Sequence, residues 1–222
     1  MRNPNTRLPN RNTLYLGRSG SGKSTALKHN PAIPGRGVPV ALWDPNEDHQ
    51  ARRYRRIGDF VKALAKADQV WRSQRRGYRV AYCGVNSQEA YNIWCQAVSE
   101  ILDGRWLTYL VAEELADVSP HAGAAPPPAK KLLNQCRKYG GIFHGTSQKP
   151  TEISKTYYSG CEIRYVGAVR SDDEVKRMAK ELAMGPHVFR SLENIEGVQV
   201  QLWYDDGRDV EKWTHRFGVM TA

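Results

Sequence analysis

The sequence predicts an α/β protein in which helices cover both faces of a mostly parallel sheet, with a small β-hairpin at the C-terminal end. Apolar runs of strand length alternate with segments of helical periodicity along most of the chain. A Gly-rich turn joins the first of these runs to a helix-forming segment. The run at residues 106–112 is apolar almost throughout, as expected of a strand covered on both faces.

The first half of the chain contains four of the predicted strands. They are the apolar runs at residues 13–16, 38–44, 78–82 and 106–112, and the helix after the first of them spans residues 23–29. Asn86 with Glu89 three residues later predicts a capping box for a second helix, which ends before Gly104. The apolar positions that recur at helical spacing in this helix are Tyr91, Trp94, Cys95, Val98, Ile101 and Leu102.

The second half of the chain continues the alternation. A Pro-rich loop at 119–131 leads to a helix that ends near Tyr139, and residues 142–146 form the next strand. Another strand lies within 161–169, and Ser171 caps a helix over 172–184. Runs at 198–204 and 212–217 flank an Asp-Asp-Gly turn and predict the terminal hairpin. We expect one domain over 1–222, with a core of about 11–185 and a hairpin of about 195–218.

Composition excludes several classes of protein. Hydrophobic residues make up 40% and charged residues 25% of the 222 residues, and no apolar run is long enough to cross a bilayer. The N-terminal residues lack the apolar segment of a signal peptide, so we expect the protein to stay in the cytoplasm. The cysteines lack paired spacing, which predicts reduced thiols rather than disulfides or a zinc site; they are Cys83, Cys95, Cys136 and Cys161.

The chain is basic, with a formal net charge of +10. Between residues 52 and 79, ten lysines and arginines stand against Asp59 and Asp68 only. Such an excess of positive charge indicates attraction to a polyanion, but it gives no information about the fold.

A nucleotide-binding motif lies between the first predicted strand and its helix. The segment GRSGSGKST fits G-x-x-x-x-G-K-[ST] from Gly17 to Ser24 in the strand–loop–helix context that this P-loop, or Walker A, motif requires. Glycines let backbone N–H groups converge on phosphate oxygens, and a helix N-terminus adds positive potential. We expect Lys23 to contact the β- and γ-phosphates of ATP and the Ser24 hydroxyl to bind Mg²⁺. The predicted nucleotide-binding residues are Gly17, Ser19, Gly20, Ser21, Gly22, Lys23, Ser24 and Thr25.

An acid pair follows the apolar strand at 106–112. A P-loop hydrolase needs a carboxylate near the metal and a group that deprotonates or orients the attacking water. We expect Glu113 on the Mg²⁺ side, as in a Walker B motif, and Glu114 as the catalytic base. The alternative is that both residues open a surface helix, where its dipole favours acidic side chains. Asp117 is a poorer candidate because it lies one helical turn further on.

Two further residues complete the predicted catalytic set. Gln148 follows the next strand, and its neutral amide suits a sensor that gains or loses a hydrogen bond to the γ-phosphate. Arg137 lies near the end of the preceding helix, where it could reach the transition state of a neighbouring subunit. Basic residues are common in the last turn of a helix for other reasons, and Arg164 and Arg170 are rival candidates.

Several segments together resemble the FtsK/HerA superfamily of ring-forming DNA translocases, over residues 14–182 in matching order. The Asp44-Pro45 turn and the Ser147-Gln148-Lys149-Pro150 motif are typical of that superfamily. The compact length is most similar to the genome-packaging ATPases of tailless, tectivirus-like viruses with an internal membrane. The segments are GRSGSGKS, WDPNED, YLVAEE, CRKYGGIFHGTSQKPTEI and CEIRYVGAVRSDDEVKRMAKEL.

This resemblance implies a P-loop NTPase with an additional strand-catalytic-E, RecA-like core. It also implies a homo-oligomeric ring, a hexamer by analogy, that hydrolyses ATP with Mg²⁺ to drive double-stranded DNA into a preformed capsid. Capsid or packaging-vertex proteins would be further partners, in the host cytoplasm or on the virion. One departure is that the superfamily usually has Asp-Glu where this chain has Glu113-Glu114, which leaves the role of Glu113 less defined.

Two segments are candidates for sequence-independent contact with DNA phosphates, and each could equally be a solvated face or a subunit interface. One is the loop 119–131, and the other is the arginine cluster Arg52, Arg53, Arg55, Arg56, Arg72, Arg75 and Arg76.

Two other functions stay open. A morphogenesis ATPase like those of filamentous phages usually has a transmembrane segment, and a small-molecule P-loop kinase would use the arginine-rich region as a phosphate-binding lid.

Overall fold

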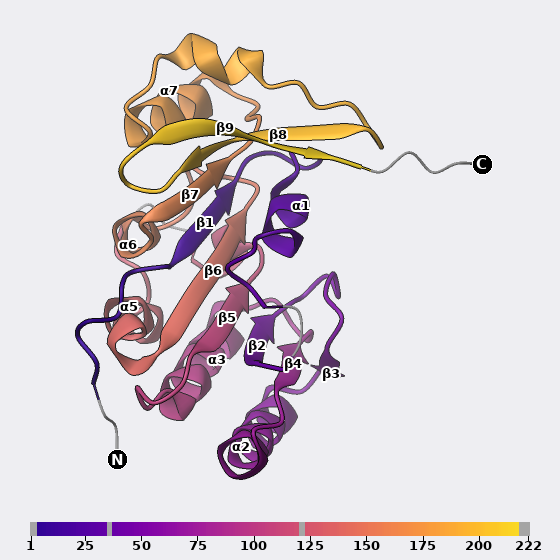
Figure 1. Ribbon diagram of the computed structural model, residues 1–222, viewed down its shortest axis with the longest axis vertical. Coiled ribbons are helices and arrows are strands. Elements are labelled where there is room, and N and C mark those ends of the chain that lie inside the picture. The colour runs from indigo at the N-terminus through magenta and orange to yellow at the C-terminus, as the bar shows by residue number, and fades with distance from the viewer. Residues whose placement is uncertain (1–3, 35–36, 120–122, 218–222) are drawn as a thin grey trace.

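The computed structural model describes residues 4–34, 37–119 and 123–217, and within them nine strands form one sheet (Figure 1). The strand order is β3-β4-β2-β5-β6-β1-β7-β8-β9. All strand pairs from β3 to β7 are parallel, whereas β7–β8 and β8–β9 are antiparallel. The strands are β1 (Thr13–Leu16), β2 (Pro39–Trp43), β3 (Arg52–Tyr54), β4 (Tyr78–Tyr82), β5 (Thr108–Ala112), β6 (Gly141–Ser147), β7 (Ile163–Val166), β8 (Gln199–Asp205) and β9 (Val210–Arg216).

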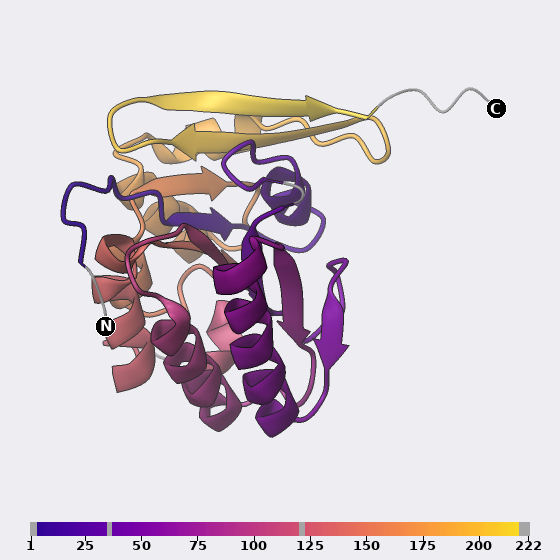
Figure 2. The same ribbon diagram turned by 60° about the horizontal axis from the view of Figure 1, so that its bottom comes forward.

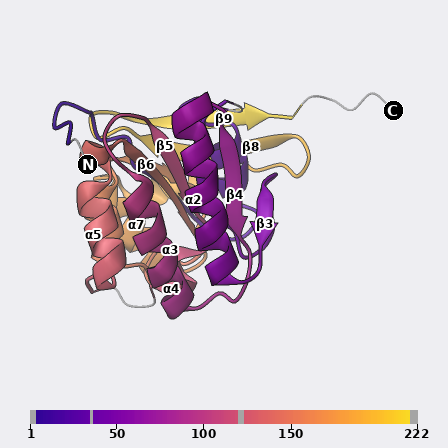
Figure 3. The same ribbon diagram turned by 90° about the horizontal axis from the view of Figure 1, so that it is seen from below.

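Helices cover both faces of the sheet, so the predicted α/β class with its C-terminal hairpin is confirmed. Figure 3 shows α2, α3 and α5 side by side beneath the sheet, whereas α1 lies near the hairpin in Figure 2. The helices are α1 (Lys23–Lys28), α2 (Ile57–Gln74), α3 (Gln88–Ile101), α4 (Leu115–Val118), α5 (Pro127–Gln135), α6 (Lys155–Gly160) and α7 (Asp172–Glu181), with short 3-10 helices η1 (Arg137–Tyr139) and η2 (Pro186–Ser191).

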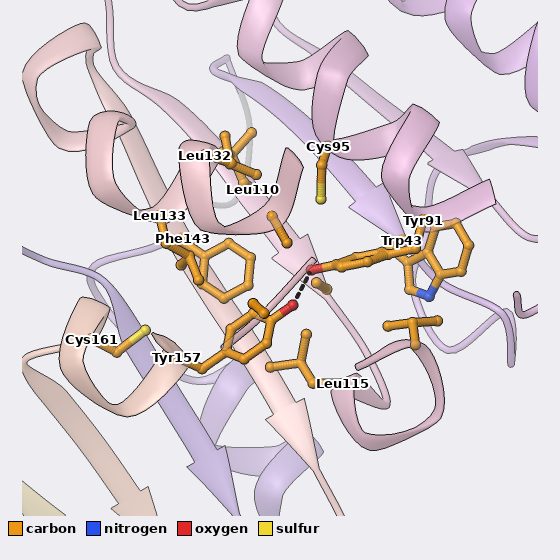
Figure 4. Packing of buried hydrophobic residues seen from close by; sticks show 14 of the residues in the cluster. Trp43, Tyr91, Cys95, Leu110, Leu115, Leu132, Leu133, Phe143, Tyr157 and Cys161 are labelled. Carbon is orange, nitrogen blue, oxygen red and sulfur yellow. Dashed lines mark hydrogen bonds between the residues drawn. The ribbon is translucent and has the colours of Figure 1, made fainter. Parts of the chain in front are cut away.

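Alternate residues of the central strands build two apolar layers. On the α2–α3–α5 face, Trp43 and Phe143 pack against Tyr91 of α3 and Tyr157 of α6, and the Tyr157 hydroxyl donates to the Tyr91 hydroxyl at 3.3 Å (Figure 4). On the opposite face, Leu27 of α1 packs in a second cluster with apolar residues of the central strands and of β8. Burial of both faces explains why these strands are apolar almost throughout.

Parallel pairing places the carboxyl ends of β1, β2, β5, β6 and β7 at one edge of the sheet. The register pairs Leu16 with Ser147 of β6 and Val166 of β7, and Ala112 of β5 with Gly145. The P-loop, the acid pair and Gln148 therefore all follow strands that end at this edge, where ligands bind in open parallel sheets. No helix in the described ranges combines the length and apolar character needed to cross a membrane.

Three local predictions differ in outcome. Ser171 caps α7 in a reciprocal capping box with Glu174, as predicted. The capping box expected at Asn86 is wrong, because Ser87 is the N-cap of α3 and its hydroxyl accepts the N–H of Ala90 at 3.2 Å. The Asn86 amide instead donates to Asp117 at 2.9 Å. The end of the predicted hairpin at residue 218 and positions 120–122 of the Pro-rich loop lie outside the described residues.

Candidate nucleotide-binding site

The P-loop is a tight, left-handed turn fixed to the strands on both sides of β1. Gly17, Gly20 and Gly22 have φ of 137°, 74° and 91°, values that glycine adopts without the strain other residues incur. The Gly17 N–H donates to the Ser147 carbonyl of β6 at 3.2 Å, and the Arg18 N–H donates to the Ala168 carbonyl at 2.8 Å. These bonds hold the loop at the carboxyl edge with the start of α1 facing the cavity beside it.

Lys23 is folded over this loop. Its Nζ donates to the Arg18 carbonyl at 3.0 Å, and its side chain is largely buried. Burial lowers the pKa of Lys23, while the nearby carboxylates of Glu114 and Glu113 oppose that shift. Lys23 lines the same cavity as both members of the acid pair, and its ammonium group can exchange the Arg18 carbonyl for a phosphate oxygen.

Glu113 continues β5 by one residue, with its N–H donating to the Trp43 carbonyl at 3.0 Å. Both oxygens of its carboxylate have partners: Oε1 lies 2.7 Å from His49 Nε2, and Oε2 accepts the hydroxyl of Thr146. Only 3% of the residue is exposed. The Glu113 side chain is therefore held in one position by Thr146 of β6 and by His49 of the turn after β2.

Glu114 has hydrogen-bonding partners different from those of the Glu113 carboxylate. Its φ and ψ of 53° and 54° are left-handed, which is uncommon for a glutamate, and its N–H donates to the Thr146 hydroxyl at 3.1 Å. The carboxylate accepts a hydrogen bond from Gln148 Nε2 at 2.5 Å. Burial raises the pKa of Glu114, while the bond from Gln148 and the charge of Lys23 oppose the rise.

The turn after β2 was expected from the Asp44-Pro45 pair, but the sequence assigned no site role to Asn46, Asp48 or His49. The buried Asp44 carboxylate accepts the N–H groups of Asp48 at 2.9 Å and His49 at 3.1 Å, which folds the turn back over the sheet edge. Burial raises the pKa of Asp44, and these hydrogen bonds oppose the rise. Asn46 and Asp48 consequently line the cavity, and His49 reaches Glu113. The signal available in the sequence was a cluster of polar residues immediately after an apolar strand.

These groups surround one open cavity of about 720 Å³. Of the predicted site residues, the structure brings Ser19, Gly20, Gly22, Lys23, Ser24, Thr25, Glu113, Glu114 and Gln148 together in its lining. Ser21 instead packs under the loop against Gly17 and Gly167. An apolar wall from the C-terminal part of the chain, with Ile195, Val200 and Phe217, was missed because it is distant in sequence from every nucleotide-binding motif.

The three candidate arginines lie in different surroundings. Arg137 precedes β6, at the amino edge of the sheet, and its guanidinium donates to the carbonyls of Thr6 at 3.1 Å and Leu8 at 2.5 Å. Arg164, within β7, donates to the Asp205 carboxylate at 3.0 Å and to two backbone carbonyls. Arg170 is exposed in the loop after β7, close to the P-loop anchor at Ala168. Of the three, only Arg170 follows a strand end at the carboxyl edge.

The predicted arginine cluster divides into exposed and engaged members. Arg52, Arg53, Arg55 and Arg56 are exposed on β3 and just before α2, although Arg53 and Arg55 also contact Glu47. Arg72 is paired with Asp68 and Asp103. The guanidinium of Arg75 lies 3.6 Å from the ring centroid of Trp106. The exposed arginines at β3, together with the exposed Arg76 after α2, are therefore the part of the cluster that is open to a polyanion.

The chain is similar to known viral and bacterial proteins. No protein-family model matches the sequence. Protein P9 of Pseudoalteromonas phage PM2 is 33% identical over 214 residues, which cover 95% of this chain and 93% of the relative. The genome packaging NTPase B204 from Sulfolobus turreted icosahedral virus 2, in complex with AMPPCP, has a TM-score of 0.72 at 15% identity and covers 95% of this chain and 99% of its own. VirB4 of Thermoanaerobacter pseudethanolicus has a TM-score of 0.57 at 11% identity, with 96% and 90% covered. Both solved structures share the fold of this chain.

The contact between the P-loop and the hairpin gives a first prediction. A Cβ added at Gly22 would lie 1.8 Å from Val200 Cγ1, so Gly22→Ala should displace the loop and raise the Kd for ATP by about tenfold or more. Gly22→Ala with Val200→Ala should recover part of that loss, because the second change removes the clashing methyl group. Gly20→Ala is the matched control, since its φ of 74° is also left-handed but its added Cβ meets nothing within 4 Å. Equal Kd values for ATP in Gly22→Ala and Gly20→Ala, measured by calorimetric titration, would contradict the clash.

Proposed function

We propose that this chain, which belongs to the same family as Protein P9 of Pseudoalteromonas phage PM2, is an ATPase that moves double-stranded DNA into a viral capsid. The resemblance to the FtsK/HerA superfamily and its packaging ATPases is confirmed in family and fold. The observation on which the proposal rests is the convergence of Lys23, Glu114 and Gln148, which follow three different strands, on one cavity. The genome packaging NTPase B204, with the same fold along nearly its whole length, supports the packaging role.

The arrangement is suited to water attack on a γ-phosphate. Lys23 would leave the Arg18 carbonyl for the β- and γ-phosphate oxygens and stabilise the charge that develops there. Glu114 would accept the proton of the attacking water, and its raised pKa makes it a stronger base than an ordinary glutamate. Gln148, already bonded to Glu114, would orient the same water with its amide.

The donor set also fits Mg²⁺ in the form bound to a nucleotide. Magnesium prefers oxygen ligands and usually keeps waters beside one or two carboxylates and substrate phosphates. Ser24 supplies a hydroxyl at the cavity, and Glu113 supplies a carboxylate whose oxygens also contact His49 and Thr146. We propose that Ser24 binds the ion directly and that Glu113 accepts hydrogen bonds from its waters. When bound, the ion would neutralise part of the charge on the phosphates.

Double-stranded DNA would be the polyanion that the basic surface attracts. The net charge of +10 and the exposed arginines at β3 support contact with phosphates in any sequence. The loop predicted at 119–131 is wrong at its end, because α5 begins at Pro127. We propose a homo-oligomeric ring, a hexamer by resemblance, in which these arginines or the segment at 123–131, including the first turns of α5, face the pore. The ring would act with capsid or packaging-vertex proteins in the infected cell or on the virion.

The catalytic base gives the second prediction. Glu114→Gln should keep the Kd for ATP within a few-fold of wild type and lower kcat by roughly 10²–10⁴-fold, because the amide cannot take the proton of water. Asp117→Asn is the matched control, since Asp117 is an exposed carboxylate one turn further on and should leave kcat unchanged. Because burial raises the pKa of Glu114, wild-type kcat should fall with decreasing pH at a pH above the usual glutamate value of 4.5. Steady-state phosphate release checks the kcat of both variants and the pH dependence of the wild type, and calorimetric titration checks the Kd for ATP. Full activity in Glu114→Gln would remove the assignment of Glu114 as the base.

Coupling to DNA gives the third prediction. Double-stranded DNA should accelerate ATP hydrolysis, and the DNA concentration for half-maximal stimulation should rise steeply with salt because phosphate contacts release counterions. Changing Arg52, Arg55 and Arg56 to Gln should flatten this salt dependence, whereas the same change at the exposed Lys176 and Lys180 of α7 should not. Light scattering should detect a ring-sized particle. Turnover that requires a small-molecule acceptor and ignores DNA would instead indicate the kinase alternative.

The trans-acting arginine gives the fourth prediction. We propose Arg170 ahead of Arg137, since Arg170 is exposed at the nucleotide edge whereas Arg137 is bonded to the N-terminal segment. Arg170→Ala should lower kcat by roughly a thousandfold. Mixing it with Lys23→Ala subunits should restore part of the activity, because each inactive subunit supplies what its neighbour lacks. Arg137→Ala should lower the melting temperature and leave kcat largely unchanged. Loss of kcat in Arg137→Ala that recovers on mixing with Lys23→Ala subunits would instead assign the role to Arg137.

A further inference from the structure

The nucleotide cavity has a second half that the phosphate chemistry does not use. Opposite the P-loop, Asn194 to Gly197, Gln199 and Val200 line it together with Phe217. Two of these are large apolar side chains that remain open to solvent, with Ile195 52% and Phe217 37% exposed. Apolar groups held open beside a charged phosphate site are typical of the part of a ligand pocket that receives a flat, weakly polar group.

A tight turn places this wall directly beside the P-loop. Ile195 and Gln199 exchange both backbone hydrogen bonds at 2.9 Å, with Gly197 at φ 70° in between. The next residue, Val200, packs on Gly22 so closely that a Cβ at Gly22 would clash with it. The wall is therefore positioned by the same contact that shapes the phosphate loop.

An aromatic row holds Phe217 in place at the end of β9. Trp213, His215 and Phe217 alternate along the chain, so they share one face of the hairpin. His215 stacks on His29 at the end of α1, with ring centroids 4.1 Å apart, and meets the Phe217 ring edge-on at 4.9 Å. The Phe217 N–H donates to the Val198 carbonyl at 2.9 Å, which joins Phe217 to the turn.

We propose that this wall binds the base of the nucleotide, with a purine ring stacked on Phe217 and in contact with Ile195 and Val200. The proposal rests on the proposed ATPase function and extends it from the phosphates to the base. Polar groups beside the stack suit the edge of a purine. The Asn194 Oδ1 accepts the Gln201 N–H at 2.7 Å, which leaves the amide N–H groups to donate to a ring nitrogen, and the exposed Glu196 carboxylate can accept from an exocyclic amine.

The cavity favours this occupant over the surface of a neighbouring subunit. The phosphate groups and the apolar wall line one continuous space of about 720 Å³, within the usual range for small-molecule sites. A nucleotide with its phosphates at Lys23 can place its base against the apolar wall of that same space. CTP should bind less tightly than ATP, because the smaller pyrimidine ring stacks on less of Phe217.

The test compares ATP with inorganic tripolyphosphate, which has the phosphates but no base. Phe217→Ala should raise the Kd for ATP by about tenfold and leave the Kd for tripolyphosphate unchanged, measured by calorimetry on the full chain. It should also reduce the preference for ATP over CTP. Phe217→Trp should keep ATP affinity, and Phe217→Leu should give an intermediate loss. The matched control is Val198→Ala, since Val198 is 54% exposed in the same turn but does not line the cavity, and it should change neither Kd.

Other outcomes overturn the inference in separable ways. An unchanged Kd for ATP in Phe217→Ala, with DNA-stimulated hydrolysis intact in wild type, overturns the base site and spares the ATPase. Equal losses for ATP and tripolyphosphate would show that the hairpin supports the P-loop only. Loss of the oligomer with unchanged nucleotide binding would assign the wall to a subunit interface. Failure of the wild-type protein to bind ATP would remove both proposals together.

Discussion

The hydroxyl of Thr146 is the link on which the candidate site depends. It donates to the Glu113 carboxylate and accepts the N–H of Glu114, so one group from β6 fixes two consecutive residues at the end of β5. The parallel register makes this possible, because Ala112 pairs with Gly145 and the next residues of the two strands stay adjacent. The turn at Glu114 then directs its carboxylate towards Gln148, two residues beyond Thr146.

Burial and charge are balanced around this link. Lys23 and Glu114 are each partly removed from water, which alone disfavours the charged form of both, and each supports the ionised state of the other. Glu113 is more deeply buried, and two hydrogen-bonding partners compensate for the water it has lost. The pair of glutamates is therefore differentiated by position: the first is immobilised within the sheet edge, and the second faces the cavity, where chemistry can occur.

The sequence was sufficient for the parts of the site that depend on local order. A strand followed by a Gly-rich loop, or by two acids, places those residues at the carboxyl edge in any parallel sheet, so Lys23, Glu114 and Gln148 could be predicted to converge. The contact of His49 with Glu113 joins residues 64 apart, and no local pattern indicates it.

Helix α2 was missed because its buried face is narrow, with Phe60, Leu64 and Asp68 as its buried residues among many charges. The cap of α3 was misassigned because Asn86 and Ser87 are both competent caps, and only the geometry selects Ser87.

The C-terminal hairpin belongs to the same sheet and the same apolar layer as the predicted core. It continues the sheet through β7, and the partly buried ion pair of Arg164 with Asp205 joins β7 to β8 at 3.0 Å. Leu202 and Val200 belong to the same apolar cluster as Leu27 of α1, the helix that begins with Lys23. A displacement of β8 would therefore be felt at Gly22, and a nucleotide that moves the P-loop would push on β8. The P-loop and the hairpin therefore pack in one continuous apolar layer, so a change in the volume of a side chain on β8 should be felt at Gly22.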